Sequence, residues 1–182
     1  MEVRRVPAEL IKGFHKTIAL LALLVVICAA GRAASQITEK QQTAERILIV
    51  KSARTMTIES SGRPIKTYKV ALGGQPIGPK QEQGDHKTPE GEYFIDTKNA
   101  HSQFYMALHL SYPSAEDTAW ARKRGVSPGG DVESHGLGKK YGWIGARHRL
   151  TDWTDACIAV TNEEIEEIFR IVPVGTRVEI KP

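Results

Sequence analysis

The stretch that decides the fold class is residues 46–72, RILIVKSARTMTIESSGRPIKTYKVAL. It begins with a short apolar run. Residues 55–59 then alternate between apolar and polar side chains, and residues 65–72 alternate again. The tract SSGRP between the second and third runs is a turn signal, and alternation with a period of two is typical of half-buried strands. The pattern predicts a three-stranded meander over residues 47–72.

The rest of the chain also shows patterns typical of β-strands. Further strands are predicted over residues 92–96, 105–110 and 177–180, separated by turns that contain Pro and Gly. Two short helices are expected on the outside of the sheets, one over 115–124 and one from Thr161 to about Ile171. Each opens with a capping residue followed by acidic residues in its first turn. The fold class is therefore mainly β, with one domain over residues 46–182 and two short helices.

The first 33 residues form an apolar leader. Residues 17–31 carry no charge, follow a basic stretch and precede small residues, which is the layout of a secretory signal peptide. The apolar run is shorter than the roughly 20 residues that a membrane-spanning helix needs. An uncleaved inner-membrane anchor is the alternative. Residues 34–45 are small and polar and are interpreted as a linker. Both alternatives place the domain outside the cytoplasm, in the periplasm or cell envelope.

The charge of the chain excludes one class of partner. The formal net charge is +4, and residues 1–31 account for half of it, which leaves +2 for residues 32–182. We find no Lys/Arg stripe of the kind that nucleic-acid-binding proteins carry. No nucleic-acid partner is expected.

Cysteine usage points to a reactive thiol. The chain has two cysteines, Cys28 in the leader and Cys157 in the domain. An exported domain with one thiol cannot form an internal disulfide, so Cys157 is either reactive or a site of intermolecular crosslinking. It follows the polar run TDWTDA and begins the apolar run CIAV, which predicts a loop-to-strand junction. The alternative is a buried small hydrophobe, and a redox module is disfavoured because no second cysteine is near.

A histidine in the same domain would supply the base. His135 stands out among the five histidines of the domain because Gly136 follows it and lets the backbone turn tightly. An imidazole in reach of Cys157 would accept the thiol proton, allow the sulfur to attack a carbonyl group and form a thioester. Backbone N–H groups near Ala156 and Cys157 would stabilise the oxyanion. The alternative is a loop imidazole without a role.

Neither a metal nor a cofactor is predicted. Cys157 and the histidines lack the paired close spacing of zinc sites, and the glycines after residue 72 are too irregular for a phosphate-binding loop. Three aromatic residues, Tyr141, Trp143 and Trp153, flank the candidate pair. They either line a substrate groove or belong to a partly buried core, and residue type favours the core.

At these residues the chain resembles the YkuD-type L,D-transpeptidases over about residues 46–180. Residues 84–95, with Thr88-Pro89-Glu90-Gly91, are similar to a signature of that family. Ser134-His135-Gly136 resembles the segment of the catalytic histidine, and Trp153-Thr154-Asp155-Ala156-Cys157 resembles the nucleophile segment. Ser111-Tyr112-Pro113 and the run from Cys157 to Asn162 are most similar to the YafK-like branch.

The resemblance implies a β-sandwich-like catalytic domain that acts on peptidoglycan stem peptides without a cofactor. Cys157 would be the nucleophile and His135 the proton donor and acceptor, with the remaining residues of the two segments binding substrate or supporting the pair. Family members cleave the L,D bond between diaminopimelate and D-alanine. They pass the acyl group to an amine of another stem peptide, a D-amino acid or a wall-linked lipoprotein, or to water. The alternatives are a hydrolase of the same links and a cell-wall-binding module without catalysis.

Three positions depart from the pattern of the family. Ala156 stands where the family usually has glycine, so it would be strained by about 1–2 kcal/mol if that position needed a positive φ. Asp155 replaces a histidine or arginine. Its carboxylate would either raise the pKa of Cys157 or orient the imidazole, as the third member of a triad does. Ala159 replaces an arginine or asparagine.

Overall fold

The computed structural model describes residues 42–182. The predicted leader and most of the predicted linker therefore lie outside the described residues. Of the linker, Ala44 is buried and its N–H donates to the carbonyl of Ile171 at 2.8 Å.

The predicted meander is present. Strands β1 (Arg46–Val50), β2 (Thr55–Ser60) and β3 (Arg63–Lys69) pair antiparallel in sequence order. The apolar residues of β1 and β2 alternate with more exposed ones, so one face of the meander covers the core. The last strand, β8 (Arg177–Lys181), lies parallel to β1 on its other side.

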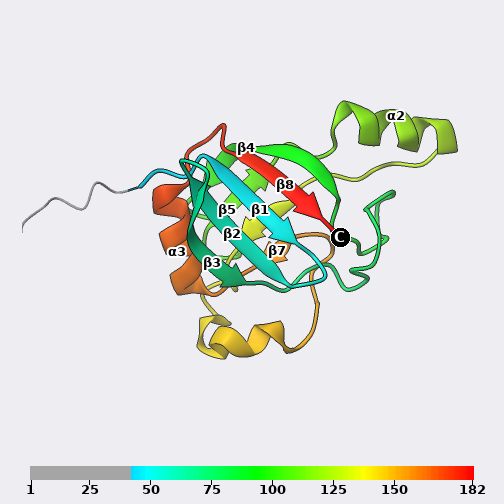
Figure 1. The fold of residues 1–182 in the computed structure, drawn as a ribbon. Coiled ribbons are helices and arrows are strands. Elements are labelled where there is room, and N and C mark those ends of the chain that lie inside the picture. The colour runs from blue at the N-terminus through cyan, green and yellow to red at the C-terminus, as the bar shows by residue number, and fades with distance from the viewer. Residues whose placement is uncertain (1–41) are drawn as a thin grey trace, which may run out of the picture. The chain divides into compact units, whose positions relative to one another are not determined.

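The sheet changes direction at β4 (Gly91–Asn99). The first half of β4 pairs with β8, and its second half pairs with β5 (Ala107–Leu110) after a register shift between Ile95 and Thr97. Such an irregularity bends a strand and increases its twist. The sheet then continues through β6 (Glu133–His135) to β7 (Ile158–Ala159). Figure 1 shows the result, with β5 and β7 behind β1, β2 and β8.

The two ends of this strand order are joined. Isolated bridges connect Ala71 with Ala159 and Gly73 with Thr154, so the chain just after β3 borders β7. The core lies between the layers and is mainly aliphatic, and every strand except β6 contributes to it, β3 through Tyr68. This curled, mainly β architecture agrees with the predicted fold class.

The two predicted helices are present with the expected capping boxes. Helix α2 (Ala115–Arg124) is capped by Ser114 and ends at Gly125, whose φ of 70° is left-handed. It buries only Ala121 and projects away from the sheets (Figure 1). Helix α3 (Asn162–Ile171) is capped by Thr161 and packs Ile165 and Ile168 into the core.

Two elements were not predicted. One is the short strand β6. The other is η1 (Gly142–Leu150), a stretch of 3-10 helix interrupted at Gly145, where φ is 52° and ψ is −139°. Its sequence has no apolar periodicity, and only His148 within it is buried.

Candidate active site

The pairing of β6 with β7 brings the two segments together. The strands are parallel, with Ser134 opposite Ile158 and His135 opposite Ala159. Cys157 directly precedes β7, so by the same register it lies opposite Glu133. Because side chains alternate along a strand, Cys157 and His135 lie on one face of the sheet, and Ser134 lies on the other. The β6–β7 pair thus brings together two segments whose candidate residues, His135 and Cys157, are 22 positions apart in the sequence.

The Cys157 sulfur is held by backbone groups. Its Sγ accepts a hydrogen bond from the N–H of Glu133 at 3.4 Å and lies 3.6 Å from the carbonyl oxygen of Asp131. Burial raises the pKa of the thiol to about 11, and the carboxylates of Glu133, Asp155 and Asp131 add to the rise. The thiol is therefore protonated at neutral pH.

The His135 ring is buried and fixed in orientation. Its Nδ1 is 2.6 Å from the carbonyl oxygen of Gly136, which can only accept, so Nδ1 carries the proton and Nε2 keeps its lone pair. Phe104 stacks on the ring with centroids 4.3 Å apart, and Trp153 meets it edge-on at 6.0 Å. Burial lowers the pKa of His135, which keeps the ring neutral and able to act as a base.

The thiol of Cys157 and the imidazole of His135 are both neutral at rest. Within residues 42–182 no hydrogen bond joins Sγ to the ring: Nδ1 bonds the carbonyl of Gly136, and Sγ contacts the backbone of Glu133 and Asp131. This arrangement differs from a preformed thiolate–imidazolium pair, which a low thiol pKa would produce.

The structure decides between the two interpretations of Asp155. Its side chain is almost fully exposed and its Oδ1 lies 3.0 Å from Nδ1 of His86, so it does not orient His135. Its charge instead contributes to the raised pKa of Cys157. The triad alternative is wrong, because the Gly136 carbonyl occupies the position that a third member would take.

Ala156 carries no strain. It is not among the residues with positive φ, and its side chain is buried in the core cluster. The expectation of a strained alanine is therefore not met. Gly136 was expected to allow a tight turn of the backbone. The structure instead shows that a larger residue would not fit there. A Cβ at that position would lie 2.7 Å from Oδ1 of Asn162 and 2.9 Å from the carbonyl oxygen of Phe104.

The loop that precedes Cys157 is held by hydrogen bonds on both sides. The hydroxyl of Thr154, which is buried, donates to the carbonyl of Cys157 at 2.8 Å. Asp152 accepts the N–H of Leu72 at 2.9 Å and forms an ion pair with Arg54 at 2.6 Å. These contacts hold the loop against the end of β3, and neither Asp152 nor Arg54 was singled out from the sequence.

Asn162 is a third residue whose role the sequence did not reveal. Its Oδ1 accepts the N–H of Leu137 at 2.8 Å, and its Nδ2 donates to the carbonyl of Gly138 at 3.4 Å. A Cβ at Gly142 would lie 2.6 Å from Nδ2, so η1 begins in contact with the same amide. One side chain from α3 thus positions both the loop after His135 and the start of η1. As the first residue of a predicted helix, it gave no signal of this role.

The competing histidines are engaged elsewhere. His109 lies 2.7 Å from Asp96, His86 bonds Asp155 and His101 is exposed. His148 is buried without a hydrogen-bond partner on either ring nitrogen, and its pKa falls to about 4 because of burial and the charge of Arg149.

The flanking aromatic residues do not belong to the core. Trp143 is 81% exposed, Tyr141 59% and Trp153 42%, so the favoured interpretation as partly buried core is wrong. The residues that fill the core in this region are aliphatic. Only Trp153 touches the candidate pair, through its contact with His135.

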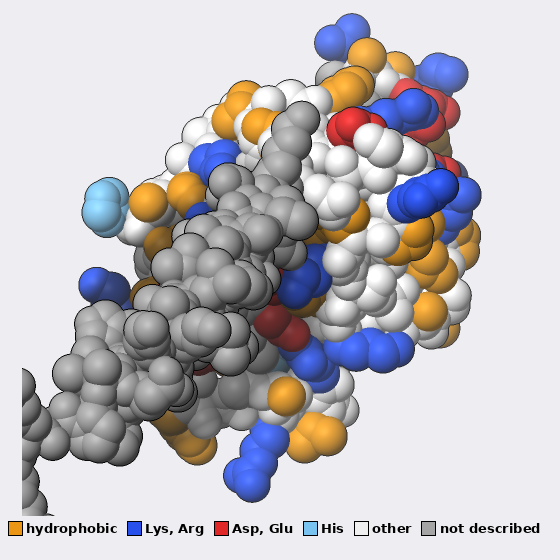
Figure 2. All heavy atoms as spheres, turned by 60° about the vertical axis from the view of Figure 1, so that its left-hand side comes forward, with side chains coloured by type: hydrophobic (Ala, Val, Ile, Leu, Met, Phe, Trp, Pro, Cys, Tyr) orange, Lys and Arg blue, Asp and Glu red, His pale blue; other side chains and the backbone are white. Residues whose placement is uncertain are grey.

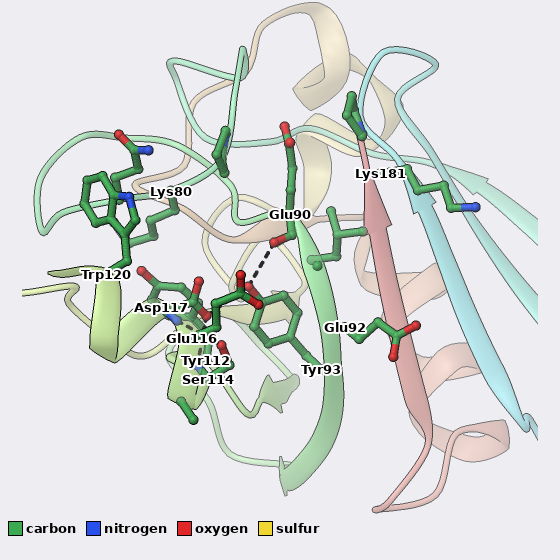
Figure 3. Close-up of a pocket in the computed structure, with 16 residues that line it drawn as sticks. Lys80, Glu90, Glu92, Tyr93, Tyr112, Ser114, Glu116, Asp117, Trp120 and Lys181 are labelled. Atoms are coloured by element: carbon green, nitrogen blue, oxygen red, sulfur yellow. Dashed lines mark hydrogen bonds between the residues drawn. The ribbon is translucent and has the colours of Figure 1, made fainter.

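A large recess of about 880 Å³ lies away from this pair. It is formed by the start of β4, the end of β8 and the first turn of α2, and Figure 3 shows Tyr93, Tyr112 and Asp117 close together among its lining residues. Several of its charged groups already have partners, such as Lys51 for Glu90 and Asp85 for Lys80. A smaller hollow of about 250 Å³ is lined by Asp96, Thr97, Asn99, His109 and Glu133.

Residues 42–182 contain no group of three or more His, Cys, Asp or Glu side chains that could hold a metal ion. They also contain no helix with the length and apolar character needed to cross a membrane.

The YkuD family model, the L,D-transpeptidase catalytic domain, matches residues 44–180. The chain belongs to this family. The matched range covers all eight strands, both helices and the segments that carry His135 and Cys157.

Two curated relatives carry the name of an L,D-transpeptidase as a proposed assignment. YafK of Escherichia coli K12 is 27% identical over 177 residues, which cover 87% of this chain and 64% of that protein. YqjB of Bacillus subtilis 168 is 26% identical over 137 residues, which cover 74% of this chain and 69% of that protein. The chain thus spans somewhat under two thirds of the length of YafK.

Solved structures share the fold. The helical cell shape determining protein Pgp2 from Campylobacter jejuni aligns with a TM-score of 0.59 and 24% identity, over 81% of this chain and 54% of Pgp2. An L,D-transpeptidase from Mycobacterium smegmatis aligns with a TM-score of 0.50 and 14% identity, over 76% of this chain and 59% of its own. At these identities the likeness establishes the architecture alone.

Proposed function

We propose that this L,D-transpeptidase-family domain is a cysteine acyltransferase that modifies peptidoglycan stem peptides. The observation that carries the proposal is the placement of Cys157 and His135 on one face of the β6–β7 pair, with the lone pair of Nε2 left free by the Gly136 carbonyl. Family membership supports the reaction class. Cys157 is the proposed nucleophile and His135 the proposed base.

The first half of the proposed reaction acylates the sulfur. Nε2 of His135 accepts the thiol proton while Sγ attacks the carbonyl carbon of the L,D bond in the stem peptide. The C–N bond breaks, the proton passes from Nε2 to the leaving amine of D-alanine, and a thioester remains. The backbone N–H groups of Ala156 and Cys157 donate no hydrogen bond within residues 42–182, so they are free to stabilise the oxyanion.

The second half transfers the acyl group. An amine attacks the thioester, loses its proton to Nε2 of His135 and forms an amide, while the sulfur leaves and recovers the proton. The acceptor is proposed to be the amine of another stem peptide, a D-amino acid or a wall-linked lipoprotein. With water in place of the amine the same residues hydrolyse the link. The site of action is proposed to be the periplasm or cell envelope, as the predicted leader requires.

The test is the mass of the intact protein after incubation with a disaccharide-tetrapeptide. We expect an acyl adduct on Cys157 and release of free D-alanine, because the bond that breaks lies before that residue. Cys157→Ser and His135→Ala should each lose the thioester adduct and all turnover while circular dichroism stays unchanged. A crosslinked product identifies an amine acceptor, whereas D-alanine release alone identifies water.

A wall-binding module without catalysis is the competing proposal. One observation favours it: the carboxylates around Cys157 oppose ionisation of the thiol. Under this proposal the purified chain binds sacculi but leaves muropeptide profiles unchanged, and a carbapenem gives no covalent adduct. Full turnover in either variant above would remove that residue from the mechanism.

A further inference from the structure

Exposed large hydrophobic side chains are concentrated in one segment. Tyr141, Trp143, Leu150 and Trp153 all lie within residues 141–153, and Trp143 and Leu150 are more than 80% exposed. Soluble proteins expose single apolar residues routinely, but neighbouring large ones mark interaction sites. The interruption at Gly145 holds the two halves of η1 as short turns with these side chains outside.

The same segment is basic and has no acidic residue. Residues 137–151 contain Lys139, Lys140, Arg147 and Arg149 and no Asp or Glu. Arg149 is paired with Glu164. Lys139, Lys140 and Arg147 are exposed and form no ion pair with residues 42–182, so their charge is available to a ligand. At the lower end of the molecule in Figure 2, where Figure 1 places η1, hydrophobic and Lys or Arg side chains are exposed next to each other.

The segment is rigidly connected to the candidate active site. Asn162 holds the loop between His135 and η1. At the other end, the N–H of Trp153 bonds the carbonyl of Leu72 at 3.1 Å, and its ring meets His135. The segment is therefore anchored at both ends next to His135.

We propose that the η1 face, defined as Lys139, Lys140, Tyr141, Trp143, Arg147 and Leu150, binds a glycan strand of peptidoglycan and thereby holds polymeric substrate at the active site. This inference rests on the proposed function. The rings of Trp143 and Tyr141 offer flat apolar surfaces to the C–H faces of sugar rings. The unpaired cations complement the carboxylates that stem peptides carry at intervals along the strand.

Charge and chemistry favour this occupant over others. A second copy of the chain would bring the same positive charges against each other if the contact were symmetric. Aromatic and basic residues also suit an anionic lipid surface, but a flat bilayer would compete with substrate for the space beside the pair. A linear polymer can run along η1 and still present one stem peptide to Cys157.

The experiment measures binding and chemistry separately. Full-length protein is sedimented with purified sacculi to obtain an affinity, and acylation of Cys157 is followed with a sugar-free tetrapeptide. Tyr141→Ala with Trp143→Ala should weaken sacculus binding at least tenfold and leave the rate of tetrapeptide acylation unchanged. Replacing Lys139, Lys140 and Arg147 by Ser should weaken binding and reduce its salt dependence.

The chain offers matched controls. Ile77, which is 87% exposed and lies in another loop, serves as the apolar control when replaced by Ala. Arg63, Arg122 and Lys123 are exposed cations outside the segment, and their joint replacement by Ser removes the same charge. The affinity of the wild type for soluble glycan fragments should also rise with the number of disaccharides. The affinity of the variant with Tyr141→Ala and Trp143→Ala should not change with that number.

Three outcomes would overturn the proposal. Sacculus binding by the aromatic variant equal to that of Ile77→Ala would show that the face is not used. If the variant with Tyr141→Ala and Trp143→Ala lost binding to vesicles containing anionic lipid but kept its binding to sacculi, the face would be assigned to a membrane. A dimer in wild type that the variant abolishes would assign it to self-association. Failure of wild type to acylate, with binding still dependent on η1, would refute the proposed function alone.

Discussion

Carboxylates surround the Cys157 thiol and oppose its ionisation. Glu133 lies opposite it in the strand register, and Asp131 and Asp155 add to the same effect. Glu133 itself is half-buried and forms no ion pair with any residue from 42 to 182, and burial raises its own pKa. Burial is the largest cause of the raised pKa of Cys157, and Glu133 makes the largest contribution among the carboxylates.

Glu133→Gln should make Cys157 more reactive toward iodoacetamide. Removal of the negative charge lowers the thiol pKa, so more thiolate is present at every pH below about 11. We expect a rate about threefold to tenfold higher at pH 8, since each unit of pKa is a factor of ten in thiolate. The measurement is mass spectrometry of the Cys157 peptide over time, and the rate–pH profile should move to lower pH.

Glu82→Gln is the control for this change. Glu82 is exposed, and its carboxylate is not among the charges that act on Cys157. Its replacement should leave the alkylation profile of wild type in place. A profile for Glu133→Gln that overlies wild type would show that backbone contacts and burial alone set the thiol pKa.

At the scale of elements, α3 supplies both packing and positioning. Ile165 and Ile168 anchor it in the core, and Asn162 at its first turn holds the loop after His135. The helix was predicted because its capping box and apolar face are local signals. The use of Asn162 as an anchor depends on segments 24 residues apart, which local signals do not report.

Asn162→Ala should lower the free energy of unfolding moderately and the rate of turnover strongly. The change leaves the N–H of Leu137 without its acceptor, which costs about 1–3 kcal/mol of unfolding free energy. It also frees the loop that orients His135, so acylation of Cys157 should fall at least tenfold in kcat. Urea unfolding and single-turnover acylation measure the two effects.

Asn162→Asp separates the two halves of the amide. It keeps an oxygen for the N–H of Leu137 and loses the donor to the carbonyl of Gly138. Most of the stability should return with only part of the turnover. Equal turnover in wild type and Asn162→Ala would show that η1 and the histidine loop hold their positions without this side chain.

At the scale of the molecule, the two ends of the curled sheet are joined near Cys157. Asp152 connects the turn after β1, through Arg54, with the chain after β3, through Leu72. The bridges from Ala71 and Gly73 lie at the same seam. The position of Cys157 thus depends on how the two ends of the strand order meet.

Asp152→Ala should destabilise the whole fold. The N–H of Leu72, a fully buried residue, loses its acceptor and Arg54 loses its partner, which we expect to cost about 1–3 kcal/mol of unfolding free energy. Chemical denaturation measures this cost. Glu92→Ala, which breaks an exposed pair with Arg177, is the control and should cost about 0–1 kcal/mol. Similar losses in both variants would argue against a special role for the seam.

The sequence by itself determined the elements with local signals. Alternation specified the meander, capping boxes specified α2 and α3, and the junction of a polar and an apolar run placed Cys157 just before β7. These features follow from interactions between residues a few positions apart, so a linear pattern records them.

Only the tertiary structure decided the environment of the candidate pair. The parallel register of β6 and β7 put His135 and Cys157 on one face, seated the Ala156 side chain in the core and turned Asp155 toward His86. It also left the aromatic residues of η1 exposed, against expectation. Burial, charge and register at these positions arise from contacts between segments that are distant in the sequence. These contacts form only when the sheet has closed, so a linear pattern does not record them.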